Sequence, residues 1–230
     1  MTTTPSGVAA PISAPPPPPG PGGIPIPFPL VSGNLTPVSG VVRVRLPNSL
    51  RFVRIETLTS IPVGTLIDAT NGVVILTVAR DRQGHLQTGE FSRGAFYFNQ
   101  AIEAIHVFGS KPPRTIRKLV TELRMARGVA SPKSCPQGSS GRIPAGPRED
   151  RGKFSRKRFV RYLQAKASGN FRVIGRHSSG LERGTSWLTR DDCTGTLTRV
   201  QKGQVVVTDY GKRRDVLVKA GKSYVATGRL

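Results

Sequence analysis

Charged residues are absent from the first 42 positions of this 230-residue chain, and acidic residues are scarce throughout it. The first charged residue is Arg43, whereas most of the twenty prolines precede it. Because proline fixes φ and has no backbone N–H, a run such as Pro15–Pro19 excludes helix and sheet and favours extended polyproline II. We therefore predict a disordered proline-rich linker over residues 1–40.

Long apolar runs and an export signal are also missing. No stretch of about 18 apolar residues occurs, which predicts no membrane-spanning helix. Residues 1–20 have neither the basic start nor the apolar segment of a signal peptide. Two explanations stay open: the chain is cytoplasmic, or it is the C-terminal part of a longer exported protein. We expect the second, because a polyproline segment is typical of a connection between modules.

Hydrolase motifs are lacking as well. His177, Ser178 and Asp191 supply the residue types of a catalytic triad, but neither Ser178 nor Ser179 lies in a Gly-x-Ser-x-Gly turn. Adjacent residues in a strand point to opposite faces, which separates His177 from Ser178. We predict that the protein is not an enzyme.

Cysteine is rare, with only Cys135 and Cys193. No Cys-x-x-Cys or His-x-x-x-His spacing involves them or the three histidines, so we expect no metal ion and no cofactor. An even pair favours a disulfide, which would close a long loop, stabilise the fold by roughly 4 kcal/mol and indicate an oxidising compartment. Two unrelated free thiols are the alternative.

Positive charge is abundant and unevenly distributed. The formal net charge is +22, and residues 111–176 alone hold 18 basic and 3 acidic residues. The candidate polyanion-binding residues are Lys153, Arg156, Lys157, Arg158, Arg161 and Lys166. Phe154, Phe159, Tyr162 and Phe171 are interleaved with them, as in surfaces that stack bases and neutralise phosphates. A solvated loop, an anionic envelope polymer and a nucleic acid all remain open as interpretations.

Alternation of apolar and polar residues dominates the rest of the chain and predicts strands. Asn71-Gly72 is a strong hairpin signal and predicts a turn directly before a β-branched run. The expected strands recur at about ten-residue spacing, which favours an all-β sandwich or roll. They cover residues 41–46, 52–55, 73–78, 87–91 and 94–98.

Two segments fit both the spacing of apolar residues in a helix and the alternation of a strand. Residues 118–125 fit a helix and a strand, and we predict a strand because the neighbouring aromatic strand needs a partner. Residues 159–167 are equally ambiguous, and there we favour one or two helical turns. Trp187, the only tryptophan, is expected in the core.

An internal repeat is suggested by the second half of the sequence. Val63-Gly64-Thr65 and Arg183-Gly184-Thr185 each precede a strand, a glycine and a Leu-Thr pair. Arg93-Gly94 and Lys202-Gly203 each precede a further strand. The order of these elements favours two similar halves.

The segment from Gly175 to Ala226 resembles a FecR-type domain. The resemblance is carried by Arg183-Gly184-Thr185, by a Lys-Gly-x-Val-x-Val strand at 202–207 and by Val-x-Val-x-Ala-Gly at 216–221. Residues 61–100 resemble a degenerate copy, and together the halves resemble the FecR-like C-terminal modules of large exported actinobacterial proteins. The resemblance implies a β-rich envelope module without chemistry of its own. It does not imply the family's siderophore signalling, because the sequence shows no inner-membrane anchor or sigma-regulator segment.

These features predict an all-β roll or sandwich of two FecR-like halves. Its parts are a linker at 1–40, a first half at 41–127, a basic irregular insertion at 128–170 and a second half at 171–228. We expect an extracellular or cell-envelope interaction module that contacts an anionic polymer or a surface protein. The alternative is a nucleic-acid-binding protein that uses the basic 111–176 region.

Overall fold

The structure is a computed structural model that describes residues 23, 25–107, 114–127, 159–192 and 195–227. The described part is all-β, as predicted, and consists of strands joined by turns. No helix within it is long and apolar enough to cross a membrane. The predictions for residues 1–22 and 128–158 concern positions outside the described residues.

The thirteen strands of the described part vary in length from three to fifteen residues. They are β1 (Ser32–Arg45), β2 (Val53–Ile55), β3 (Thr59–Pro62), β4 (Leu66–Ala79), β5 (Leu86–Ser92), β6 (Ala95–Val107), β7 (Arg114–Ala126), β8 (Phe159–Ser168), β9 (Phe171–Ile174), β10 (Ser178–Asp192), β11 (Gly195–Asp209), β12 (Arg214–Lys219) and β13 (Ser223–Thr227).

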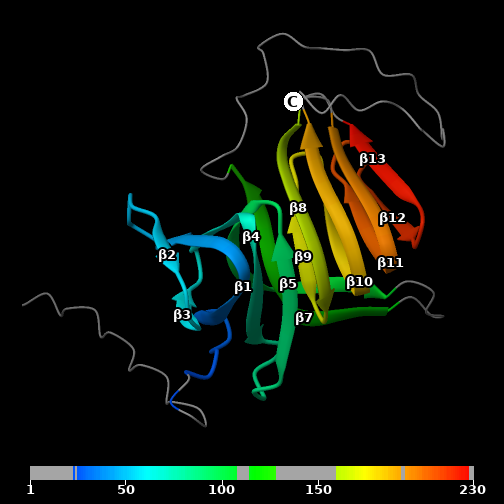
Figure 1. The fold of residues 1–230 in the computed structure, drawn as a ribbon. Coiled ribbons are helices and arrows are strands. Elements are labelled where there is room, and N and C mark those ends of the chain that lie inside the picture. Colours follow the sequence, from blue (N-terminus) through cyan, green and yellow to red (C-terminus); the bar gives the residue numbers. More distant parts are fainter. Residues whose placement is uncertain (1–22, 24, 108–113, 128–158, 193–194, 228–230) are drawn as a thin grey trace, which may run out of the picture.

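All of these strands belong to one sheet that closes on itself. Hydrogen-bonded neighbours run in the order β10, β8, β5, β4, β6, β7 and β9, and β9 pairs again with β10 to complete a ring. The β7–β9 pairing is parallel, and the other pairings of the described strands are antiparallel. β1 to β3 extend the sheet beyond β4, and β11 to β13 extend it beyond β10 (Figure 1).

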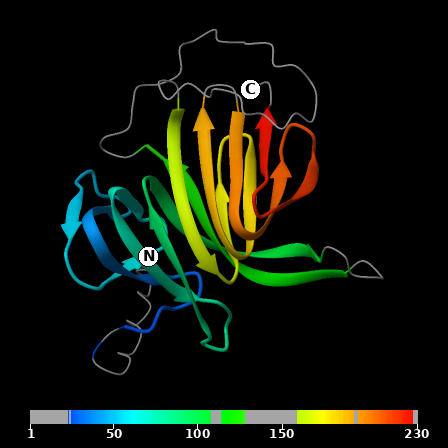
Figure 2. The ribbon, with the colours of Figure 1, turned by 45° about the vertical axis from the view of Figure 1, so that its right-hand side comes forward.

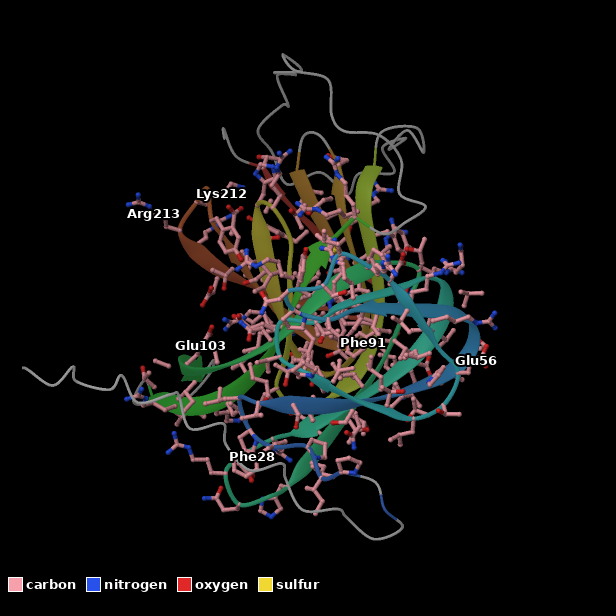
Figure 3. The ribbon with its side chains drawn as sticks, turned by 90° about the vertical axis from the view of Figure 1, so that its left-hand side faces the viewer. Phe28, Glu56, Phe91, Glu103, Lys212 and Arg213 are labelled. Atoms are coloured by element: carbon pink, nitrogen blue, oxygen red, sulfur yellow. The ribbon has the colours of Figure 1, made fainter. Side chains whose placement is uncertain are left out.

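Aromatic rings fill the inside of the ring of strands. Phe91 lies in the middle of the molecule (Figure 3) and contacts Phe96 and Phe171, with ring centroids 5.4 and 5.6 Å apart. Trp187 is fully buried in the same core, as the sequence predicted. Each buried ring contributes on the order of 2 kcal/mol through the area it removes from water. The core therefore joins the first and second halves of the chain.

The alternation seen in the sequence corresponds to buried and less buried faces. Along β4, Val74, Leu76 and Val78 are buried while the residues between them are only half-buried. The strands predicted at 41–46, 73–78, 87–91 and 94–98 lie largely within β1, β4, β5 and β6. The strand predicted at 118–125 is confirmed as part of β7.

The hairpin predicted at Asn71-Gly72 is wrong. Both residues lie in the middle of β4, where Gly72 faces Gly40 of β1. A Cβ on Gly40 would lie 2.2 Å from the carbonyl oxygen of Asn71, and a Cβ on Gly72 would lie 2.7 Å from that of Val41. Glycine is required here because the two backbones approach closely beside a register shift, not because the chain reverses.

Two predicted boundaries also need correction. β1 begins at Ser32, inside the predicted linker, and Pro37 is accommodated at a register shift between β1 and β4. Residues 159–168 form β8, so the predicted insertion does not extend to 170, and the helical turns expected at 159–167 are wrong. β8 is held as a strand by pairing with β5 on one side and β10 on the other.

The structure gives a different correspondence between the halves from the one predicted. Gly64 precedes β4, whereas Gly184 lies inside β10, so the two are not equivalent. Gly-Thr-Leu at 64–66 instead matches Gly-Thr-Leu at 195–197, and Gly72 and Gly203 follow at the same spacing. In this alignment β4 corresponds to β11. β4 pairs with β1, and β11 pairs with β10.

Candidate anion-binding site

Two hollows on the surface share Arg124 of β7 and Arg161 of β8. The larger one, here called the mixed hollow, has a volume of about 770 Å³. Its lining residues come from β6 to β12 and from the turns between them. Its lining consists of Ala104, Glu122, Arg124, Arg161, Arg172, Ile174, Gly175, Arg176, Ser179, Leu181, Val206, Thr208, Tyr210 and Asp215.

The position of the mixed hollow follows from the topology. The far ends of β6 and β7 extend beyond the ring as a two-stranded arm (green in Figure 2), which supplies Ala104. The β11–β12 turn lies on the opposite side. Figure 3 labels Glu103 in the arm and Lys212 in the β11–β12 turn. Ala104, next to Glu103, and Tyr210 and Asp215, near Lys212, line the hollow.

The smaller one, here called the arginine hollow, has a volume of about 380 Å³. Its lining combines four arginines with aromatic and aliphatic side chains, and no carboxylate of the described residues belongs to it. The lining consists of Arg45, Phe52, Leu66, Tyr97, Arg124, Met125, Ala126, Arg127 and Arg161.

Six arginines line the two hollows together, against two carboxylates, Glu122 and Asp215. We call the six the arginine track: Arg45, Arg124, Arg127, Arg161, Arg172 and Arg176. A guanidinium presents a planar fork of donors that matches phosphate, sulfate and carboxylate groups, and it stays charged at any physiological pH. The track therefore has the chemistry of an anion-binding surface.

Arg161 is held in place by a buried carboxylate. Its Nη2 lies 2.7 Å from Oδ2 of Asp191, and its Nη1 donates to the carbonyl oxygen of Met125 at 3.0 Å. Asp191 also accepts the backbone N–H of Arg176 at 3.1 Å and the hydroxyl of Thr196 at 2.5 Å. One buried side chain thus fixes Arg161 and the backbone that carries Arg176.

Arg172 is held by one acidic residue of β6 and one of β7. It pairs with Glu103, and its Nη1 lies 3.7 Å from Oε1 of Glu122. Burial, and then the neighbouring Glu103 carboxyl, raise the pKa of Glu122, although Arg172 and Arg124 oppose the shift. The charge of Arg172 is therefore largely balanced by these two carboxyl groups.

Arg45 is positioned by two aromatic rings. Its Nη2 donates to the hydroxyl of Tyr97 at 3.0 Å, and its guanidinium lies 5.5 Å from the centroid of the Phe52 ring. Arg124, Arg127 and Arg176 are exposed, and none of them forms an ion pair with a carboxylate of the described residues. These three are the cations most available to a ligand.

The structure brings only part of the predicted polyanion-binding set to this site. Arg161 lines both hollows, whereas Lys166 is exposed on β8 beside Glu90 and lines neither of them. The remaining candidates, and both cysteines of the predicted disulfide, lie outside the described residues: Lys153, Arg156, Lys157, Arg158, Cys135 and Cys193.

The other residues considered from the sequence, His177, Ser178 and Phe171, are buried in the fold. His177 and Ser178 are buried, and the ring Nε2 of His177 and Oγ of Ser178 have no hydrogen-bond partner among the described residues. Burial lowers the pKa of His177, which Asp191 partly offsets. Phe171, expected among exposed stacking rings, is fully buried in the core. The described residues contain no cluster suited to a metal ion.

Sequence reasoning did not single out five of the six track residues. Four of them fall within the basic 111–176 region, but nothing in its pattern separates them from its other cations. Arg45 lies far from that region and approaches it only because β4, β6 and β7 bring their ends together. The alternation around Arg45 predicted that its side chain faces outward but not what lies beside it.

Comparisons with known proteins give no parallel: no family model, no curated protein and no solved structure matches the chain.

Proposed function

We propose that this protein is a non-enzymatic interaction module that holds an anionic polymer of the cell envelope along the arginine track. The observation that carries the proposal is the convergence of six arginines on two hollows that share Arg124 and Arg161. A ligand that reaches both hollows has to be extended, which favours a polymer over a small anion.

The partial pairing within the track supports binding. Asp191 and Glu103 hold Arg161 and Arg172 in fixed positions, so less side-chain freedom is lost when a ligand arrives. Arg124, Arg127 and Arg176 remain exposed for direct contact. The held arginines would orient the anionic groups of a ligand, and the exposed arginines would attract them.

An envelope location is part of the same proposal. It is supported by the FecR-type resemblance, by the proline-rich segment before β1 and by the even pair of cysteines. Trapping thiols at lysis and measuring the intact mass before and after reduction tests it. A gain of about two hydrogens fits a Cys135–Cys193 disulfide and an oxidising compartment, whereas two trapped thiols contradict both.

Direct binding tests the proposed ligand class. The full-length protein is titrated with hyaluronate and with poly(glycerol phosphate) at fixed salt, alongside the double variant Arg124→Ala/Arg127→Ala. Each lost charge-assisted contact weakens binding by about tenfold. The matched control Arg80→Ala/Arg82→Ala removes the same charge from exposed positions in the β4–β5 turn, which line neither hollow. Equal losses in both double variants, or no binding by the unaltered protein, would contradict the proposal.

Nucleic acid is a second candidate because aromatic rings accompany the arginines. Phe52 and Tyr97 line the arginine hollow, and bases stack on such rings in proteins that bind single strands. Single-stranded DNA is therefore titrated in parallel. Binding of DNA more tightly than either envelope polymer, together with its loss in Arg124→Ala/Arg127→Ala, would favour this candidate.

A further inference from the structure

We propose that the polymer is an acidic glycan, with its anionic group in the arginine hollow and its hydroxyl-bearing sugar in the mixed hollow. This inference rests on the proposed function and narrows the ligand class. It follows from the different side chains that the two hollows offer on either side of Arg124 and Arg161.

The mixed hollow offers acceptors and donors together. Asp215 and Glu122 contribute carboxylate oxygens, and Ser179, Thr208 and Tyr210 contribute hydroxyl groups. Asp215 is exposed and already accepts the Thr208 hydroxyl at 2.7 Å, which leaves further lone pairs for a ligand. Sugar hydroxyls both donate and accept, so they satisfy this combination.

The floor of the mixed hollow also suits a sugar ring. Ile174, Leu181 and Val206 lie between the polar side chains, and Ile174 and Val206 are only 7% and 6% exposed. A pyranose has an apolar face of C–H groups and a rim of hydroxyls. Apolar residues below and polar residues around the edge match that distribution.

The charged side chains of the arginine hollow are all donors. Its four arginines lie around Leu66 and Met125, which are 3% and 1% exposed. No carboxylate of the described residues lines this hollow, and of its four guanidinium groups only that of Arg161 is paired with a described carboxylate, Asp191. Apolar surroundings strengthen the attraction between a guanidinium and an anion, so the charged group of the ligand is best placed in this hollow.

A phosphodiester strand fits the pair of hollows less well. Its backbone repeats a negative charge at every unit, and the internal phosphates have no hydrogen to donate to Glu122 or Asp215. Those carboxylates would repel the next phosphate along the track. One face of the Phe52 ring is also covered by Arg45, which reduces the surface available to a base. The carboxylates thus favour a glycan over a nucleic acid.

Substitution of Asp215 separates the two ligand classes. The full-length protein and its Asp215→Ala variant are titrated with hyaluronate, inorganic polyphosphate and single-stranded DNA. Loss of a hydroxyl acceptor weakens hyaluronate binding by about fivefold. Binding of polyphosphate and DNA is unchanged or stronger, because a repelling charge has gone. Glu56→Ala is the matched control, since Glu56 is an exposed carboxylate that lines neither hollow and lies far from Glu103 and Lys212 (Figure 3).

The outcomes distinguish the inference from the proposed function. Stronger binding of all three polyanions to Asp215→Ala would overturn the glycan assignment. The proposed function would still stand if Arg124→Ala/Arg127→Ala loses binding. DNA bound more tightly than hyaluronate would assign the track to nucleic acid. Failure of the arginine variant to weaken binding of any probe would overturn both.

Discussion

The strand pairs β1–β4 and β10–β11 are built alike, yet each contributes to a different hollow. In each pair a glycine with positive φ on the first strand, Gly40 or Gly184, lies beside a glycine on the second, Gly72 or Gly203. The register of both pairs shifts close to this crossing. The shared feature is therefore structural, because it lets two long strands bend closely past each other.

The side chains at the ends of the two pairs differ. The first pair presents Arg45 and Leu66 to the arginine hollow. The second pair presents Ser179, Thr208 and other residues to the mixed hollow and includes the buried Asp191, which holds Arg161. One scaffold thus carries two kinds of surface, and in the proposed function the specificity for a ligand would come from what each pair presents.

Substitution of the crossing glycines gives the largest expected effect. Gly203→Ala would place a Cβ 2.4 Å from the carbonyl oxygen of Gly184, and Gly40→Ala makes a similar clash with β4. Each variant loses more than about 3 kcal/mol of unfolding free energy, from steric overlap and backbone strain. Gly84→Ala is the control, because Gly84 also has positive φ but has open space around its Cβ position, and it loses only about 1 kcal/mol.

Urea unfolding of the three variants measures these losses. Similar large losses in Gly40→Ala and Gly203→Ala support a shared architecture of the two pairs. A loss in Gly40→Ala no greater than that in Gly84→Ala would show that the first crossing tolerates a side chain and that the pairs differ.

Removal of a buried carboxylate is expected to destabilise the β10–β11 pair more than the β1–β4 pair. Asp191→Ala leaves Arg161 without its carboxylate partner and frees the backbone that carries Arg176, and it costs about 3 kcal/mol. Asp68→Ala in the first pair removes the carboxylate that accepts hydrogen bonds from the N–H and hydroxyl of Thr70, and it costs about 1 to 2 kcal/mol. The free energy of unfolding is measured for both, and a larger loss in Asp68→Ala would contradict the comparison.

Glu182 makes the second pair sensitive to pH. Burial raises its pKa to about 7, although hydrogen bonds from the Gly184 N–H and the Thr185 hydroxyl oppose the shift. Since its pKa is higher in the folded than in the unfolded state, folding is favoured while the carboxyl is protonated. Stability therefore falls as pH rises from about 4.5 through about 7, by roughly 3 kcal/mol.

Glu182→Gln removes this dependence because the amide stays neutral. The midpoint of thermal unfolding is compared between pH 5 and pH 8 for Glu182→Gln, for the unaltered protein and for the exposed control Glu56→Gln. A fall with rising pH that persists undiminished in Glu182→Gln would show that another group is responsible.

Period-two alternation and turn residues were enough to predict parts of β1, β2, β4, β5 and β6, because these strands bury one face more than the other. Pairing of β9 with both β7 and β10 was not predictable, since it joins residues far apart in the sequence. Asn71-Gly72 misled for the same reason: its glycine is explained by Gly40 on the partner strand and not by a local turn. The β8 segment has no decisive pattern and becomes a strand through its neighbours.

The candidate site was predictable only as a basic region. Composition located 18 cations at 111–176, yet only the closed ring of strands brings Arg124 and Arg161 beside Arg45. In the sequence, Asp191 was considered only as a residue type of a catalytic triad. Its ion pair with Arg161 depends on the register of β8 against β10. Side-chain convergence is a property of topology, which local pattern does not encode.

Salt dependence of hyaluronate binding tests the arginine track most directly. The logarithm of the association constant is measured against the logarithm of salt concentration for the unaltered protein, Arg124→Ala/Arg127→Ala and Arg80→Ala/Arg82→Ala. If the track binds the polymer, the association constant falls with rising salt, and this dependence is less steep in the first double variant and unchanged in the second. Equal slopes in all three proteins would contradict binding through the track.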